Sequence, residues 1–291
     1  MILTKKLSFI VLLSLISYFS LGQKHSVHKK NKSFLGLTGG VNFTLPSITD
    51  RYYILTSIET ADGELFDKKY DKFFQNGGTQ FGIHYSYNFT NSISVIGGFG
   101  YQSVGFNYFT DYSWVDTVNN HELNREMHHL QKISYFTVPI MVRWDIVTRG
   151  QLVPFVQGGV FMNFRHQAKK SINYDNTIDG EETENDLSSS SIVSISDYTR
   201  KFNMGLTGGI GLNYYTKYFT VGLESNFRYG FFKIMNDETR YSDLNGFALQ
   251  YLDVMDQMRM SNLNVQLSLA VPIDHSISTN ILRRKRYNKK R

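Results

Sequence analysis

The stretch YFTVPIMVRWDI, residues 135–146, decides the fold. Its even positions, from Phe136 to Ile146, are all apolar, whereas its odd positions include Arg143 and Asp145. Because successive side chains of a β-strand point to opposite faces, this stretch predicts a strand with one apolar and one polar face.

The same alternation recurs elsewhere in the chain. Four further segments show it clearly: 79–89, 202–214, 219–233 and 262–271. Three less regular segments complete a set of eight predicted strands: 34–45, 92–108 and 152–166. The apolar positions of the second of these change phase near Ser103, which predicts a β-bulge there.

The spacing of the predicted strands distinguishes between β architectures. Long connections are expected at 44–76, 109–131, 167–200 and 235–257, and short ones at 90–91, 147–151 and 215–218. Most predicted strands have 11 to 16 residues, longer than the roughly 5–6 of globular proteins and enough to cross a bilayer when tilted. This pattern predicts an all-β fold: an eight-stranded antiparallel up-and-down transmembrane β-barrel with four long outer loops and short periplasmic turns. A soluble β-sandwich is the alternative.

Composition agrees with a β protein. The chain of 291 residues has 19 Tyr, 22 Phe and 23 Gly, whereas Ala, the best helix former, occurs at only four positions. The absence of Cys excludes disulfide frameworks, thiolate zinc sites and cysteine catalysis.

The N-terminus predicts export. Lys5 and Lys6 precede an apolar run that ends before Gly22, as in a secretory signal peptide, whereas a membrane-anchoring helix is the alternative. We therefore expect a signal peptide at 1–22, a periplasmic lead-in at 23–33, the barrel at 34–273, a basic periplasmic tail at 274–291, and a location in the cell outer membrane.

The formal charge of +6 is concentrated at the two ends of the chain. Two of the 31 basic residues lie in the signal and seven at 283–291, which leaves 22 against 25 acidic residues in the rest of the chain. The tail predicts either a docking segment for an acidic protein, anionic lipid or the cell wall, or a solvated extension. Its basic residues are Arg283, Arg284, Lys285, Arg286, Lys289, Lys290 and Arg291. Despite the basic charge, we expect no nucleic-acid partner, because an exported barrel does not encounter the chromosome.

Several charged and polar side chains fall on the inward faces of the predicted strands. A narrow barrel fills its own lumen, and buried charges must pair, so we expect an interior charge network. Its members are Arg143, Asp145, Glu224, Arg228 and His84. A general acid/base pair of Glu224 with His84 is the alternative. Inward Gly205, Gly209 and Gly211 should relieve crowding.

Two segments carry weak metal signals, and we expect no cofactor. His121, His128 and His129 resemble a zinc-protease motif, but position 125 is Arg, where a second His is needed. The segment 175–186 has the spacing of a calcium loop with Gly180 at its sixth place. Its candidate ligands are Asp175, Thr177, Asp179, Glu181 and Asp186. An acidic surface loop is the simpler interpretation. The serines at 188–191 lack a nucleophile elbow.

Four motifs carry a resemblance to a known family. They are GLTGGVN at 36–42, YFTVPI at 135–140, PFVQGG at 154–159 and GLTGGIG at 205–211. In their order and spacing the chain resembles the PorT-like "outer membrane protein beta-barrel" proteins of Bacteroidetes-type bacteria. The resemblance implies an OmpX-like or OmpA-like barrel, and some relatives serve type IX secretion or gliding. A departure is the end of the chain, which continues about twenty residues past Val271.

Three functions are compatible with these observations. We expect a non-enzymatic envelope scaffold or accessory subunit, surrounded by outer-membrane lipid and lipopolysaccharide, that contacts a protein partner through its loops or tail. The alternatives are a lipid- or peptide-modifying outer-membrane enzyme and a small pore or transporter.

Overall fold

The computed structural model describes residues 32–52, 68–71, 75–116, 121–146, 150–178, 181–182, 191–216, 218–240 and 253–273. The predicted signal peptide, nearly all of the lead-in and the basic tail lie outside this range. The strands are β1 (Ser33–Asp50), β2 (Lys69–Tyr70), β3 (Gly77–Asn88), β4 (Ile93–Asp116), β5 (His121–Asp145), β6 (Leu152–Ile178), β7 (Glu181–Glu182), β8 (Ser191–Ser194), β9 (Phe202–Tyr215), β10 (Thr220–Gly230) and β11 (Gln257–Pro272). No helix in this part of the chain is long and apolar enough to cross a membrane.

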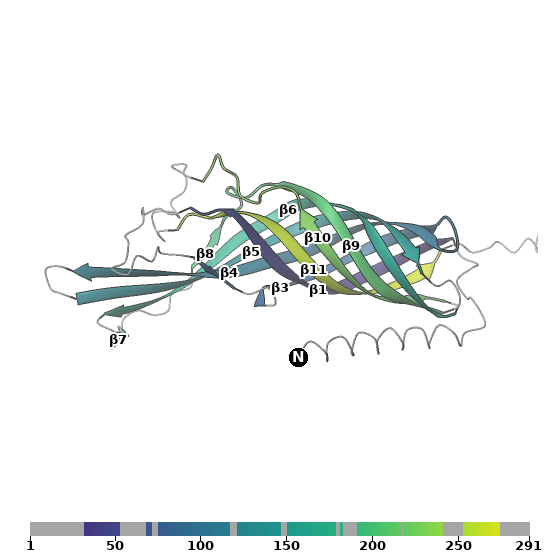
Figure 1. Ribbon diagram of the computed structural model, residues 1–291, viewed down its shortest axis with the longest axis horizontal. Coiled ribbons are helices and arrows are strands. Elements are labelled where there is room, and N and C mark those ends of the chain that lie inside the picture. Colours follow the sequence, from purple (N-terminus) through teal and green to yellow (C-terminus); the bar gives the residue numbers. More distant parts are fainter. Residues whose placement is uncertain are drawn as a thin grey trace, which may run out of the picture.

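Eight of these strands close into a barrel (Figure 1). Each pairs antiparallel with the next in the order β1, β3, β4, β5, β6, β9, β10, β11, and β11 pairs back onto β1 from Phe34↔Pro272 to Asp50↔Gln257. The predicted fold is confirmed, and the sandwich alternative is wrong.

The apolar faces predicted from the alternation point out of the barrel. Ile140, Val142 and Trp144 are exposed, with 55% of Trp144 accessible, and the corresponding positions of the other strands are exposed too. A surface of this kind is stable only against lipid, so we define the part of the barrel that carries it, from the short turns up to Phe136 on β5, as the membrane-spanning part.

Short connections join the strands at one end, at 89–92, 146–151 and 216–219. Both described chain ends lie at this short-turn end, since Phe34 pairs with Pro272. We call the opposite end the outer end. There the predicted loops 109–131 and 167–200 were wrong in large part, because β4 and β5 remain paired as far as Asp116↔His121, and β6 follows β5 to Ile178. These three strands form an arm that projects beyond the rest of the barrel (Figure 1).

The polarity of the barrel wall inverts between its two halves. On β4, even-numbered residues face inward throughout; apart from Ile96 they are polar or glycine up to Gln102, and they become apolar at Val104, Phe106 and Tyr108. The pairing of β4 with β5 keeps one register across this point. The bulge predicted near Ser103 is therefore wrong. The phase changes because apolar side chains point outward to lipid in the membrane-spanning part, whereas they point inward in the outer half, as in a protein surrounded by water.

A bulge does occur on the neighbouring strand pair. The register of β5 against β6 shifts between Ser134 and Tyr135, which leaves His166 as an extra residue on β6. Beyond it the alternation of β6 is reversed, so Ala168 and Lys170 point inward and Lys169 points outward.

Candidate functional site

The lumen of the membrane-spanning part contains an ion pair between β5 and β10. Arg143 Nη2 lies 3.1 Å from Glu224 Oε2, and the guanidinium also donates to Gln157 Oε1 at 2.8 and 2.9 Å. The Gln157 amide in turn donates to Glu224 and to Asn226, both at 2.6 Å. The Arg143 guanidinium lies 3.8 Å from the centre of the Phe155 ring. Opposite charges are thus paired and hydrogen-bonded where burial demands it.

A second polar layer lies nearer the outer end. Arg228 donates to Gln102 at 2.5 Å, the Gln80 amide donates to Gln266 at 2.7 Å, and Thr137 donates to Asn163 at 2.8 Å; the six residues come from β3, β4, β5, β6, β10 and β11. These bonds cross the lumen or join neighbouring strands, so the layer closes much of the barrel's cross-section.

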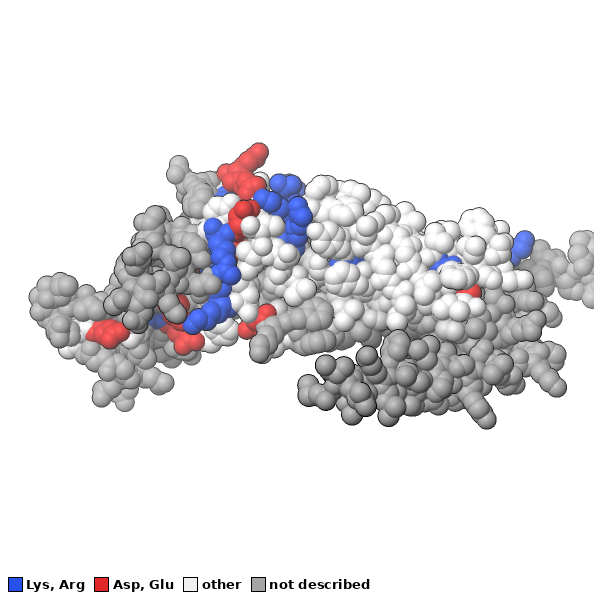
Figure 2. Space-filling model, in the orientation of Figure 1, with Lys and Arg blue, Asp and Glu red and all other residues white. Residues whose placement is uncertain are grey.

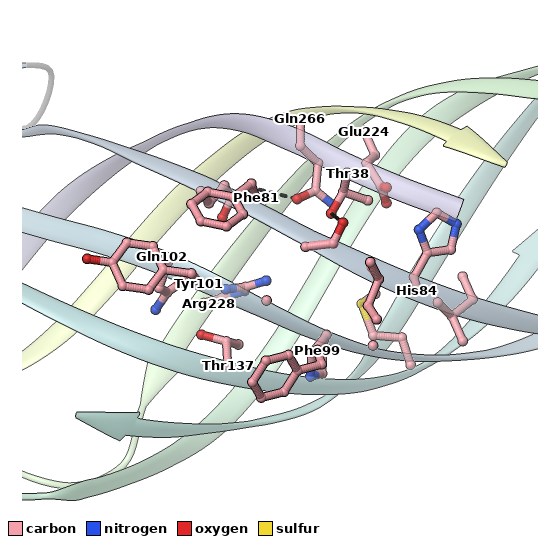
Figure 3. A pocket seen from close by; sticks show the side chains of 18 of the residues that line it. Thr38, Phe81, His84, Phe99, Tyr101, Gln102, Thr137, Glu224, Arg228 and Gln266 are labelled. Carbon is pink, nitrogen blue, oxygen red and sulfur yellow. Dashed lines mark hydrogen bonds between the residues drawn. The ribbon is translucent and has the colours of Figure 1, made fainter. Parts of the chain in front are cut away.

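The predicted charge network is therefore joined only in part. The structure brings Arg143 and Glu224 into contact, whereas Arg228 takes an amide partner. Asp145 lies buried near the short-turn end, two residues from Arg143 along β5. His84 lines a cavity of about 50 Å³ together with Glu224, Arg228 and other residues. The side chains around this cavity come from strands on several sides of the barrel (Figure 3). Its volume suits a few water molecules.

Inward glycines make room for these side chains. A Cβ at Gly205 would lie 1.9 Å from the carbonyl oxygen of Tyr229, and one at Gly211 would lie 2.4 Å from the ring of Phe155. Both positions need the close approach that glycine permits.

The outer end of the lumen is closed by a buried charge cluster, which we call the mouth cluster. It consists of Lys68, Tyr70, Tyr108, Lys170, Asp253 and Asp256. Lys68 Nζ lies 3.0 Å from Asp253 and 3.1 Å from Asp256, and Lys170 pairs with Asp253. Tyr108 donates to Asp253 at 2.6 Å, and Tyr70 donates to Asp256 at 2.7 Å. Two ammonium groups thus balance two carboxylates, with the side chain of Lys170 fully buried.

An apolar layer surrounds the mouth cluster. Its members are Val104, Phe106, Ile133, Tyr135, Ala168, Ile195, Tyr198, Ile234, Met235, Met255, Met258 and Met260. They come from four strands and from the connections 195–201 and 231–256. Together with the mouth cluster they seal the barrel above its polar lumen.

Burial and pairing set the ionisation of the mouth cluster. Burial raises the pKa of Asp253, but Lys170 and Lys68 outweigh it and hold that pKa well below its usual range. Burial lowers the pKa of Lys68, yet its two carboxylate partners leave it above the ordinary value. Burial prevails at Lys170, whose pKa falls to about 8 despite its bond to Asp253. All these directions follow from charges removed from water and held by their partners.

His129 closes one side of the mouth cluster. Its ring stacks on Tyr108 with centroids 4.6 Å apart, and its Nε2 lies 2.8 Å from Thr110 Oγ1. Burial, then the neighbouring Lys170, lowers the pKa of His129 to about 3, so the ring is neutral.

The histidines do not form a metal site. His128 is exposed on the other face of β5, against Phe109 and Glu126, because consecutive strand residues face opposite sides. Among the described residues no three His, Asp or Glu side chains gather as metal ligands. Of the calcium candidates, Asp175 and Thr177 lie on β6 and Glu181 on β7, whereas Asp179 and Asp186 fall outside the described residues.

Sequence reasoning missed the mouth cluster. Lys68, Lys170, Asp253 and Asp256 all fall in predicted loops, where a charged residue is ordinarily solvated. One signal was present: Lys170 lies midway between Ala168 and Ile172, at the spacing of a single strand face.

Comparison with known proteins agrees with this architecture. Residues 22–236 match the family model described as "Outer membrane protein beta-barrel domain". The chain belongs to this family. The description of this family and the lipid-facing surface of the barrel place this protein in the outer membrane. No curated protein sequence matched the chain.

Several solved barrels resemble this family member at low identity. The N-terminal β-barrel domain of Pseudomonas aeruginosa OprF shares 13% identity, with 82% of this chain and 98% of that chain covered and a TM-score of 0.31. Neisserial surface protein A shares 9%, with 83% and 97% covered and a TM-score of 0.35. Ail of Yersinia pestis, in complex with sucrose octasulfate, shares 13%, with 82% and 99% covered and a TM-score of 0.30.

Proposed function

We propose that this barrel is a non-enzymatic, non-conducting scaffold or accessory subunit of the outer membrane, which acts through its surfaces. The observation that carries the proposal is the filled lumen: two polar layers in the membrane-spanning part lie below an apolar layer and an ion-paired cluster at the mouth. A barrel closed in this way offers no continuous water path, and its function falls to its exterior.

Conductance tests the first half of this proposal. The full-length protein in planar bilayers should give no reproducible single-channel steps. A positive control is the variant Arg143→Ala/Arg228→Ala, which removes the two guanidinium groups that cross the lumen. Steps from the wild-type protein would favour the pore alternative and refute the proposal.

The enzyme alternative centres on Glu224 and His84. Glu224 is held by Arg143 and Gln157, and the cavity that it shares with His84 has room for water but not for a lipid or a peptide. The variants Glu224→Gln and His84→Gln should keep the phenotype of the wild-type strain, provided that each still folds. Loss of function in both folded variants would argue for catalysis.

Partner contact is the second half of the proposal. The arm of β4, β5 and β6 extends past the rim, and 24 to 27 residues per strand exceed the roughly 9–11 needed to span a bilayer. The resemblance of the four sequence motifs to PorT-like barrels supports a partner in type IX secretion or gliding. The basic tail supports a contact on the periplasmic side.

Deletion of residues 276–291 separates these contacts. With tail docking, the deletion should abolish cross-links to periplasmic proteins, and replacing only the seven basic residues by Gln should do the same. Shortening the hairpin between Asp111 and Glu126 should instead affect partners outside the cell. Cross-links and phenotype that survive both changes would overturn the scaffold proposal.

A further inference from the structure

The outer boundary of the apolar surface is marked by aromatic rings, which we call the outer girdle. It comprises Phe136, Phe164, Phe202, Tyr229 and Phe231, all exposed. Phe164 and Phe202 lie 5.3 Å apart across β6 and β9, and Tyr229 and Phe231 lie 6.2 Å apart. Aromatic rings of this kind occupy the level at which acyl chains give way to lipid headgroups.

Four exposed cations lie directly beyond the outer girdle. They are Lys132 on β5, Lys169 on β6, and Arg200 and Lys201 before β9, and we call them the outer basic patch. Within the described part of the chain none of the four forms an ion pair. Figure 2 shows Lys and Arg side chains gathered at the edge of the uncharged barrel wall. The patch therefore lies at the headgroup level with its charges available.

Lys132 and Lys169 are directly opposite each other on neighbouring strands. Both side chains point outward, and like charges at such positions repel, since their Cβ atoms are about 5 Å apart. The bulge at His166 creates this arrangement, because it reverses the alternation of β6 and brings Lys169 out while Lys170 turns in. An anion between the two ammonium groups would remove the repulsion.

Arg200 and Lys201 border an open hollow of about 650 Å³. Phe202 and Phe232 contribute an apolar wall, and Asp197 is the acidic residue among the lining. The segment is held in place by Arg165, which donates to the carbonyl and hydroxyl oxygens of Thr199 at 2.7 and 2.5 Å. The hollow thus combines cations with an apolar wall that continues into the outer girdle.

We propose that the outer basic patch binds the phosphate groups of a phosphorylated glycolipid in the outer leaflet. The lipid's acyl chains pack on the outer girdle and the wall below it. One phosphate lies between Lys132 and Lys169, and another contacts Arg200 and Lys201. Four residues of β6 separate the two places, roughly 13 Å, so a headgroup with two phosphates reaches both. The source is a lipid because the patch adjoins the lipid-facing surface.

Binding of diphosphorylated lipid A to the full-length protein in detergent, followed by native mass spectrometry, tests this site. Each cation removed near an anionic headgroup should weaken binding about fivefold, so Lys132→Gln/Lys169→Gln should bind about 25-fold more weakly. Arg200→Gln/Lys201→Gln should show a similar loss. Lys132→Arg/Lys169→Arg, which keeps the charges, should retain binding.

The control Lys32→Gln/Lys69→Gln removes two charges outside the patch, one near the short-turn end and one on β2, where Lys69 pairs with Asp111 at 3.3 Å. It should bind lipid A as tightly as the wild type does. If the control weakens binding as much as the patch variants do, the effect depends on net charge alone and the proposal is wrong. Dephosphorylated lipid A should bind weakly to every variant. If inorganic phosphate alone competes fully with lipid A, the site is one for free phosphate and the lipid assignment is wrong. A boiling-dependent gel shift verifies that each variant is folded.

Discussion

Asp253→Asn removes the carboxylate that joins Lys68 to Lys170 in the mouth cluster. Lys68 keeps Asp256 at 3.1 Å, but Lys170, fully buried, loses the carboxylate with which it pairs. Leaving one member of a buried ion pair uncompensated costs about 3–5 kcal/mol. We therefore expect the free energy of opening the mouth to fall by that amount.

Hydrogen exchange at the amide of Ile234 measures this loss. The amide donates to the carbonyl of Met258 at 2.9 Å within the apolar layer, so it exchanges only when the mouth opens. A loss of about 3–5 kcal/mol corresponds to exchange roughly 10²- to 10⁴-fold faster. Amides between Leu206 and Ile210 of the membrane-spanning part should exchange at the wild-type rate.

A charge-balanced variant provides the control. Lys170→Met/Asp253→Asn leaves one ammonium group and one carboxylate, so most of the lost protection should return, as expected when a whole buried pair is replaced. Less than threefold faster exchange in Asp253→Asn would show that the cluster does not hold the mouth closed. No recovery in the double variant would show that the carboxylate acts through its hydrogen bonds instead.

Three further perturbations probe other parts of the barrel. Gly205→Ala should lower the free energy of unfolding by about 1–3 kcal/mol, because its Cβ would lie 1.9 Å from a carbonyl oxygen. Gly208→Ala should be nearly neutral, because its Cβ would lie 3.9 Å from the nearest atom. Urea titrations that follow the folded band on unboiled gels measure both. Leu267→Arg, at a position 60% exposed midway along the lipid-facing part of β11, should cost about 2–4 kcal/mol on refolding into vesicles, and Val271→Arg near the short-turn end should cost less than about 1 kcal/mol; equal costs would contradict the assigned membrane position. The depressed pKa of His129 means that the neutral ring contributes stability above pH 6.5, which is lost as the pH falls toward about 3, by at most about 1.4 kcal/mol per pH unit. His129→Gln should flatten the pH dependence of the thermal midpoint in that window, and an unchanged slope would exclude His129 as its origin.

The lipid-facing half of the barrel could be predicted from sequence because its environment is simple. Lipid on one side and a polar lumen on the other produce strict alternation, and the outward positions of Ile140, Val142 and Trp144 confirm it. Strand order then follows from short and long connections, which leave little choice of neighbours.

The outer half could not be predicted in the same way. Beyond the girdle the apolar residues turn inward, as at Phe106 on β4, and the same rule then suggests a bulge that does not exist. The bulge that does exist, at His166, depends on the register of β5 against β6. This register cannot be predicted from the sequence of one strand alone.

The candidate site depended on contacts between distant parts of the chain. Lys170 and Asp253 are 83 positions apart, and Lys68 is farther still from its two carboxylates. Each lies in a polar segment where it resembles a solvated residue, and only the closed ring brings the four charges together. The interior charges were easier to find, since Arg143 and Glu224 lie on the polar face of strands whose alternation is regular.

The mouth cluster also has a consequence for the order in which this protein is assembled. Lys68 lies in the connection between β1 and β3, and Asp253 and Asp256 immediately precede β11, so the cluster straddles the seam at which the first and last strands of the ring meet. Its ion pairs are incomplete until β11 has paired with β1. We therefore expect these charges to stay hydrated until that pairing forms, and a chain truncated before β11 would lack the strand pairing that brings the cluster together.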